Sequence, residues 1–325
     1  MSERRYDPTA AEWVTFASHR QDRTFQPPAA VCPLCPERPG GPPTEVGGRP
    51  FDMAVFDNRF PSYQPDPPQP DITGDDLLRV EPARGRCEVV VYTPDHEGSL
   101  AGLGPVGART LVDVWTDRYR ILGADPAVRY VLPFENRGVT VGVTLSHPHG
   151  QIYAYPEVPP RPARELAVAT TYRRTTGRCV QCDVRDREQS LGARVVAEAD
   201  GWLASVPFWA RFPYELQLLP RRHRASLVDL DDAERDGLAD LLVRVLTGYD
   251  RLFGFPLPYV LGVFQAPTDE GDWSAVSHVR VSICPPHRAA DRLKHLAGSE
   301  LLAGAFLTDI APETAAATLR ALMAS

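Results

Sequence analysis

Apolar and polar positions along the chain predict a mixture of strands and helices. Runs with two-residue alternation and many β-branched side chains, which are typical of strands, occur at residues 88–92, 139–145, 201–206, 214–219, 259–264 and 278–284. Apolar residues at helical spacing occur at residues 111–123, 163–176, 231–253 and 312–323. Asp231 precedes an acidic first turn and is expected to cap the third of these helices. Together these elements predict an α+β fold, with strands paired as meanders and helices on one side of them.

The composition is typical of a globular protein with a substantial core. At 325 residues, of which 43% are hydrophobic, the chain is long enough for two domains or for one duplicated unit. Its net charge of −7 argues against a protein that coats nucleic acid or anionic membrane. No apolar run approaches the length of a membrane span, and the first residues lack a signal-peptide core. We therefore expect a cytoplasmic protein that partners neither nucleic acid nor membrane.

Landmarks recur in the same order in the two halves, which predicts an internal duplication. Residues 56–61 resemble 208–213, residues 90–100 resemble 218–227, and residues 147–151 match 278–282. We expect the two repeats to span residues 1–165 and 166–325.

Four of the six cysteines form two Cys-x-x-Cys pairs, one in each half. In a cytoplasmic chain such pairs favour zinc thiolates over disulfides, and a redox pair is the alternative. With two histidines each, the halves offer Cys2His2 sets suited to tetrahedral zinc, namely Cys32, Cys35, His96 and His147, and Cys179, Cys182, His223 and His278. Because four protein ligands leave no open position, both zinc ions are expected to be structural.

The stretch His147-Pro148-His149-Gly150-Gln151 carries the candidate chemistry. If it is a strand, His147, His149 and Gln151 share one face. An imidazole that attacks phosphorus needs its second nitrogen oriented and its neutral form favoured, and neighbours in such a row can provide both. Two buried, hydrogen-bonded histidines in an ordinary strand are the alternative. The second half has Arg280 and Ser282 where the first has His149 and Gln151, so we expect one active site per chain.

Several motifs between Tyr6 and the C-terminus match a known family. They are Tyr6-Asp7-Pro8 with Trp13-Val14, Ser18-His19-Arg20-Gln21-Asp22-Arg23, Cys32-x-x-Cys35, Ala83-Arg84-Gly85, Pro94-Asp95-His96, Phe134-Glu135-Asn136-Arg137-Gly138, the histidine stretch and Leu293-Lys294-x-x-Ala297-Gly298-x-Glu300. With them the chain resembles the galactose-1-phosphate uridylyltransferases of the histidine-triad superfamily. Glutamine at the last polar position of the histidine stretch is typical of the transferase branch. The resemblance implies a duplicated histidine-triad-like fold, whose two repeats form a mostly antiparallel sheet (an open half-barrel) with helices packed on it.

The resemblance also implies a ping-pong exchange of UMP between UDP-glucose and galactose 1-phosphate. His149 would attack the α-phosphorus, and Gln151 would donate a neutral amide hydrogen bond to a phosphoryl oxygen. Further implied substrate-binding positions are Arg20 and Arg23 for phosphate, Asn58, Phe60, Val89 and Asn136 for the nucleoside, Gly142 and Thr144 beside its phosphate, and Lys294 for phosphate. Lys294 is the only lysine in the chain. A homodimer with shared active sites is implied as well, in which the segment that carries Lys294 reaches the partner.

Three features depart from the family pattern. Arg59 replaces an acidic residue beside the nucleoside, and Phe306 lies near the position of an expected phosphate-binding glutamine. Phe264, and Arg280 with Ser282, stand where some members have iron-binding histidines, so we expect zinc and no iron. A UDP-hexose transferase is the leading hypothesis. The alternatives are an ADP-glucose phosphorylase-like or other sugar-1-phosphate nucleotidyltransferase, and a non-enzymatic nucleotide-binding protein stapled by zinc.

Overall fold

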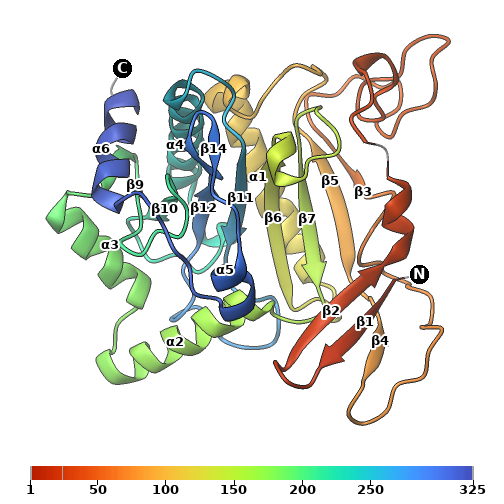
Figure 1. The fold of residues 1–325 in the computed structure, drawn as a ribbon, viewed down its shortest axis with the longest axis horizontal. Helices are drawn as coiled ribbons and strands as arrows, with labels where there is room; N and C mark the ends of the chain where they lie inside the picture. Colours follow the sequence, from red (N-terminus) through yellow and green to blue (C-terminus); the bar gives the residue numbers. More distant parts are fainter. Residues whose placement is uncertain (1, 24, 324–325) are drawn as a thin grey trace.

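The computed structural model describes residues 2–23 and 25–323, and it has the α+β architecture that the sequence predicts (Figure 1). The helices in this part of the chain are α1 (Gly104–Gly123), α2 (Pro160–Thr176), α3 (Val180–Leu191), α4 (Asp232–Leu252), α5 (Gly298–Ala303) and α6 (Pro312–Met323). The strands are β1 (Ser2–Asp7), β2 (Glu12–Ala17), β3 (Ala54–Asp57), β4 (Val80–Pro82), β5 (Arg86–Val91), β6 (Tyr130–Arg137), β7 (His149–Tyr155), β8 (Val195–Ala199), β9 (Trp202–Ser205), β10 (Leu216–Pro220), β11 (Tyr259–Phe264), β12 (Arg280–Cys284), β13 (His287–Ala289) and β14 (Arg292–Leu293).

One antiparallel sheet of nine strands forms the centre of the molecule, in the order β3-β5-β7-β6-β11-β12-β10-β9-β8. The sheet is open, with β3 and β8 at its edges. Its first four strands come from the first half of the chain, and the next four repeat their connectivity in mirror order. β6 and β11 join the halves, with Tyr259 opposite Arg137 and Gly262 opposite Phe134. The arrangement is that of two like units placed edge to edge.

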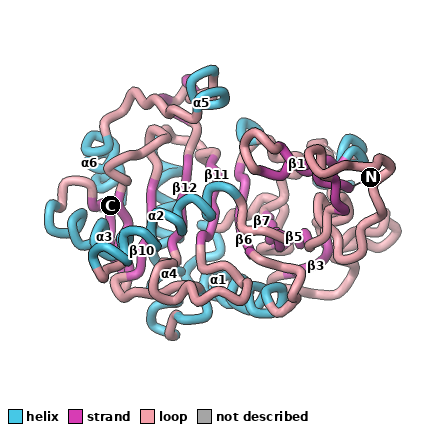
Figure 2. The backbone as a smooth tube through the Cα atoms, turned by 90° about the horizontal axis from the view of Figure 1, so that it is seen from below, coloured by secondary structure: helices cyan, strands magenta, loops and turns pink. Residues whose placement is uncertain are grey.

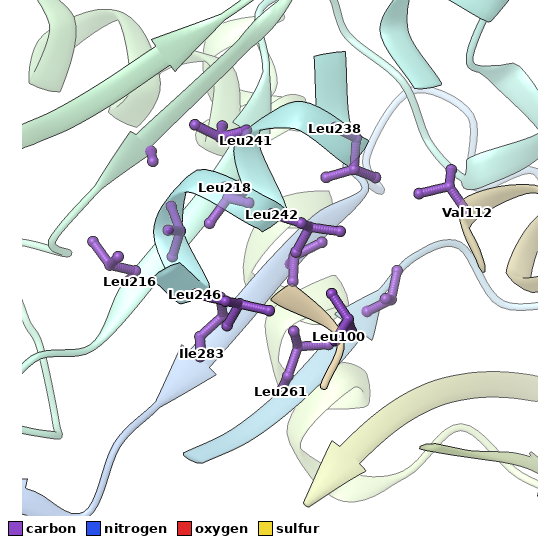
Figure 3. Close-up of a cluster of buried hydrophobic side chains, with 14 of the residues drawn as sticks. Leu100, Val112, Leu216, Leu218, Leu238, Leu241, Leu242, Leu246, Leu261 and Ile283 are labelled. Atoms are coloured by element: carbon purple, nitrogen blue, oxygen red, sulfur yellow. The ribbon is translucent and has the colours of Figure 1, made fainter. Parts of the chain in front are cut away.

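The main core lies between this sheet and the helices α1 and α4, which cover one of its faces (Figure 2). Leucines of α4 at helical spacing meet apolar residues of β10, β11 and β12 (Figure 3), and the buried leucines of α4 are Leu238, Leu241, Leu242 and Leu246. Asp231 caps α4 as predicted, because its Oδ1 accepts from the Glu234 N–H at 2.9 Å while the Glu234 carboxylate accepts from the Asp231 N–H at 3.0 Å. None of the helices in the described ranges combines the length and the apolar character needed to cross a membrane.

The predicted strand at residues 139–145 is wrong. Val139–Val141 form a 3-10 turn, and the chain then continues as a loop up to His149. Gly138 has a φ of 92° and Gly142 a φ of 84°, conformations that glycine adopts readily and that interrupt a strand. The residues of this loop are therefore not part of a sheet, although several of them are β-branched.

His147 also lies outside the strand on which it was expected, because β7 begins at His149. The row is thus reduced to His149 and Gln151, which share a face of β7. The sequence pattern does not predict the separate sheet β2-β1-β4, the helix α3 or the C-terminal helix α5. Figure 2 shows α5 on the side of the main sheet opposite α1 and α4, so the helices do not all lie on one side.

Candidate active site and metal groups

The first predicted Cys2His2 set comes together beside the start of β7. One ligand atom from each of Cys32, Cys35, His96 and His147 lies within 4.8 Å of every other. The Cys35 Sγ is 3.2 Å from Nδ1 of His96 and 3.4 Å from Nδ1 of His147, and the two rings are nearly perpendicular at 81°. Cys32 and Cys35 lie in the loop after a 3-10 turn (Ala29–Val31), so no redox-type helix follows this pair.

Hydrogen bonds on the outer nitrogens orient both imidazoles of this first group. The carbonyl oxygen of Thr93 can only accept, so Nε2 of His147, 2.8 Å away, carries the proton and Nδ1 presents its lone pair toward the cysteine sulfurs. Nε2 of His96 lies 3.2 Å from the Ser146 hydroxyl. The Thr93 carbonyl thus fixes the tautomer that a metal ligand needs at His147, and the Ser146 hydroxyl can accept from His96 in the same tautomer.

The second predicted set is assembled in the same way in the other half. Ligand atoms of Cys179, Cys182, His223 and His278 also lie within 4.8 Å of one another. The Cys182 Sγ is 3.4 Å from Nδ1 of His223 and 3.5 Å from Nδ1 of His278, and Nε2 of His223 donates to the Ser274 carbonyl at 2.7 Å. Cys179 is the N-cap of α3 and Cys182 lies in its first turn, so here the pair stands at the start of a helix.

The donor atoms of both groups fit one tetrahedral ion each. A zinc ion with ordinary bonds to sulfur and nitrogen would separate these donors by about 3.5 Å. The sulfur–nitrogen pairs in contact within the two groups are separated by 3.2 Å, for Cys35 and His96, to 3.8 Å, for Cys179 and His278. Both groups can therefore hold a metal, with no position left for substrate.

His149 is the first residue of β7, and its ring is oriented by the residue two positions earlier. Its Nδ1–H donates to the backbone carbonyl of His147 at 2.8 Å, so Nε2 keeps a lone pair. Burial lowers the pKa of His149 below its ordinary value, which favours the neutral, nucleophilic form. The next residue must be glycine, because a Cβ at Gly150 would lie 2.2 Å from the Tyr92 hydroxyl.

A chain of amide hydrogen bonds orients Gln151, which lies on the same face of β7 as His149. Asn58 follows β3, and its Oδ1 accepts from the Phe60 N–H at 2.9 Å. That contact directs the Asn58 amide nitrogen to Oε1 of Gln151, at 3.4 Å. With its oxygen occupied, Gln151 can offer its NH2 group to an anionic ligand.

A cavity brings most of the predicted site residues together. It is lined by Arg23, Pro33, Leu34, Glu45, Phe56, Asn58, Arg59, Phe60, Val89, Thr144, Leu145, His149 and Gln151. Of the predicted set, Arg23, Asn58, Phe60, Val89, Thr144, His149 and Gln151 line it. Gln26 contacts the cavity wall at Thr144, whose carbonyl accepts from the Gln26 N–H at 2.7 Å.

Four predicted site residues do not line this cavity. The Arg20 guanidinium donates to the Phe60 carbonyl at 3.3 Å, to the Ser62 hydroxyl at 2.6 Å and to the Tyr153 hydroxyl at 3.0 Å. Asn136 lies on β6 opposite Val260, and Gly142 follows the 3-10 turn Val139–Val141. The Lys294 ammonium is 2.9 Å from Glu300 Oε1. Lys294 also donates to the carbonyl of Leu307, so its partners within the chain belong to the C-terminal segment.

Sequence reasoning missed several residues of the cavity wall. Leu34 lies inside the first Cys-x-x-Cys pair, and Phe56 is on β3 two residues before Asn58. Both could have been found from their spacing to predicted site residues. Glu45 lies in a proline- and glycine-rich loop with no periodic pattern, so nothing in the sequence indicated it.

In the second half, Arg280 opens β12 as His149 opens β7. Its guanidinium is buried, pairs with Glu165 of α2 and lies 4.3 Å from the ring centre of Phe264. This position therefore holds a paired cation, which cannot act as a nucleophile.

Comparisons with known proteins agree over the whole chain. Sequence models for the N-terminal and C-terminal domains of galactose-1-phosphate uridyl transferase match residues 1–159 and 165–325. A galactose-1-phosphate uridylyltransferase from Thermotoga maritima is 39% identical over 324 residues, covering 98% of each chain. A solved uridylyltransferase structure superposes with a TM-score of 0.88 at 34% identity, covering 99% of this chain and 98% of the other. An Arabidopsis thaliana ADP-glucose phosphorylase with bound ADP-glucose shares the fold, with a TM-score of 0.75 at 24% identity and 98% coverage of each chain.

Proposed function

The chain belongs to the galactose-1-phosphate uridylyltransferase family, and from this premise we propose that it exchanges UMP between UDP-glucose and galactose 1-phosphate through a uridylyl-histidine on His149. The observation that carries the proposal is the hydrogen bond from Nδ1–H of His149 to the His147 carbonyl, 2.8 Å long. It leaves Nε2 as the nucleophilic atom, in the cavity that Gln151 and Arg23 also line.

In the first half-reaction the Nε2 lone pair forms a bond to the α-phosphorus of UDP-glucose. The bond from that phosphorus to the bridging oxygen breaks, and glucose 1-phosphate leaves with the electron pair. In the second half-reaction a phosphate oxygen of galactose 1-phosphate attacks the same phosphorus. The nitrogen–phosphorus bond then breaks, UDP-galactose leaves, and His149 returns to its neutral form.

Gln151 and Arg23 assist by binding the phosphoryl oxygens. The Gln151 NH2, oriented through Asn58, would donate to an oxygen whose charge grows in the transition state. An amide has no proton to give to a leaving group, so Gln151 supports transfer to a sugar phosphate without helping water to react. Arg23 is exposed at the cavity and supplies positive charge to the diphosphate.

We assign a structural zinc ion to each Cys2His2 group. The first ion would hold the side chain of His147 and, through it, the backbone carbonyl that orients His149. The proposed repeats of residues 1–165 and 166–325 would then contain one ion each, in keeping with the mirrored strand order. We also propose a homodimer in which Lys294 of one subunit binds phosphate in the site of the other.

Intact-mass analysis after incubation with single substrates tests the proposal. Protein incubated with UDP-glucose alone should gain the mass of one UMP group, and added galactose 1-phosphate should remove it. His149→Ala should gain nothing, while Thr171→Ala, an exposed residue of α2 outside the cavity lining and both metal groups, should still form the adduct. Turnover without any adduct, or an adduct on His149→Ala, would contradict the covalent mechanism.

An adenine-specific relative is the second candidate. One reason is that Arg59, in the cavity lining, replaces the acidic residue that the family pattern has beside the nucleoside. The other is that an ADP-glucose phosphorylase shares the fold. ADP-glucose in the same mass experiment distinguishes the two, because an AMP adduct without a UMP adduct would select this alternative.

A further inference from the structure

Glu45 is the one carboxylate among the described residues that line the cavity. Its N–H donates to the Pro33 carbonyl at 2.8 Å, which fixes the loop against the first Cys-x-x-Cys pair. Oε1 lies 3.3 Å from Nη1 of Arg59, and the Glu45 side chain is 29% exposed against 70% for Arg59. Oε2 has no hydrogen-bond partner within the described ranges. Both residues of the pair line the cavity, and the Glu45 side chain is the more buried of the two.

The surroundings of Glu45 divide the cavity into parts of different chemistry. Val46, next in sequence, packs in one cluster with Leu34, Phe56 and Val89, which offers apolar surface for a base. His149 and Gln151 form the polar part that accepts the phosphate in the proposed function. A nucleotide that spans both parts places its ribose between them.

We propose that Glu45 determines specificity for ribonucleotides by accepting hydrogen bonds from the vicinal 2′- and 3′-hydroxyls of the ribose, while Arg59 positions its carboxylate. Two carboxylate oxygens match two adjacent hydroxyl donors, and an uncompensated carboxylate would repel the diphosphate of a nucleotide sugar. Arg59 removes that repulsion by pairing with Oε1 and leaves acceptor positions on both oxygens. Arg59 replaces an acidic residue of the family pattern. It pairs with another acidic residue, Glu45, which lines the same cavity.

This inference rests on the proposed function, and its test uses the metal-loaded full chain with ribose and deoxyribose probes. The ratio of kcat/KM for UDP-glucose to that for its 2′-deoxyribose analogue should be about ten to a hundred in the wild type, the range for a hydrogen bond to a charged group. In Glu45→Gln, which retains the shape but weakens the acceptor, the ratio should fall severalfold, and in Glu45→Ala it should approach one. Glu37→Gln removes an exposed charge from the same loop outside the cavity and should keep the wild-type ratio.

Calorimetric binding of UMP and 2′-deoxy-UMP separates this inference from the proposed function. If no nucleotide sugar reacts but binding discriminates and loses discrimination in Glu45→Ala, the transferase proposal fails and the role of Glu45 stands. An unchanged ribose preference in Glu45→Ala overturns the inference, as does a wild type with no preference. A Glu45→Ala variant that loses only the preference for uracil over cytosine also overturns it, because the carboxylate would then recognise the base.

Discussion

The Nδ1–H of His149 donates to the backbone carbonyl of His147, 2.8 Å away, while the side chain of His147 belongs to the first Cys2His2 group. The backbone of one residue therefore connects a metal group to the proposed nucleophile. Because the ligand atom of His147 is in its side chain and the orienting atom is in its backbone, substitutions can separate the two roles.

We expect His149→Ala to abolish uridylyl transfer while metal content and thermal stability stay close to wild type, since its ring contributes no ligand atom. His147→Ala should lose about one equivalent of metal and several kcal/mol of stability, because a structural zinc site contributes directly to folding. Elemental analysis, thermal denaturation and the transfer assay check all three properties. Substantial turnover by purified His149→Ala would rule out the covalent intermediate.

Asn58 is expected to act through Gln151, because its amide nitrogen is 3.4 Å from Gln151 Oε1. Asn58→Ala should lower kcat by about tenfold, the value of one neutral hydrogen bond, with a smaller change in KM. Gln151→Ala should lower kcat further.

The double variant provides the decisive comparison for this pair. If Asn58 only orients Gln151, the double variant is no slower than Gln151→Ala alone. Independent, multiplicative losses would show instead that Asn58 contacts substrate by itself.

The parts of the site that could be predicted are those that short stretches of the sequence determine. The metal ligands combine rare residue types in a duplicated order, and His149 with Gln151 follows from two-residue spacing on a strand. Their roles stay predictions, since the structure fixes positions and contacts only. β11 and α6 were predicted with the bounds observed, because each has an uninterrupted period.

What could not be predicted depends on contacts between distant segments or on backbone conformation. Arg20 donates to Tyr153, 133 positions away, and does not line the cavity. Glu45 approaches Arg59 from a loop without a pattern. The loop after Gly138 has strand-like composition, but the positive φ of Gly138 and Gly142 prevents pairing.

Glu135 gives a pH-dependent prediction that does not involve the metal groups. It is buried on β6, and desolvation raises its pKa from an ordinary 4.5 to about 7. Arg137 and a hydrogen bond from the Tyr259 hydroxyl, at 3.1 Å, act in the opposite direction and lower the pKa. The Tyr92 hydroxyl and Asp250 are the other titratable groups that act on it. The folded state therefore retains a proton that the unfolded chain loses between these two pKa values.

The sign of the effect follows from that difference in bound protons. Between pH 4.5 and about 7 the folded state binds more protons at Glu135 than the unfolded state does. The free energy of unfolding therefore falls as the pH rises through this window, and Glu135 causes no further fall above it. Glu135→Gln removes the dependence and should gain stability relative to wild type from pH 5 to pH 8, by up to about 3 kcal/mol. Denaturant unfolding at both pH values measures this gain, with the exposed Glu270→Gln as control. An equal difference at both pH values would show that Glu135 is ionised in the fold.

The two Cys2His2 groups use separate ligands and should lose metal independently. We expect about two zinc ions per chain by elemental analysis, one for each tetrahedral group. Cys179→Ser should retain about one, and Cys284→Ser, a cysteine outside both groups, should retain both. Two retained ions in Cys179→Ser, or one in the wild type, would contradict a closed site in the second half.

The proposed homodimer can be tested through Lys294. Within one chain Lys294 binds Glu300 and the Leu307 carbonyl and does not line the cavity of His149, so a catalytic use requires another arrangement, such as a second subunit. His149→Ala and Lys294→Ala should each be inactive alone. Mixed under conditions that exchange subunits, they should recover about a quarter of wild-type activity, because half of the dimers would be mixed and each of these has one intact site of two. Native mass spectrometry measures the heterodimer fraction. If heterodimers form and activity stays at background, Lys294 acts within its own chain or takes no part in the reaction.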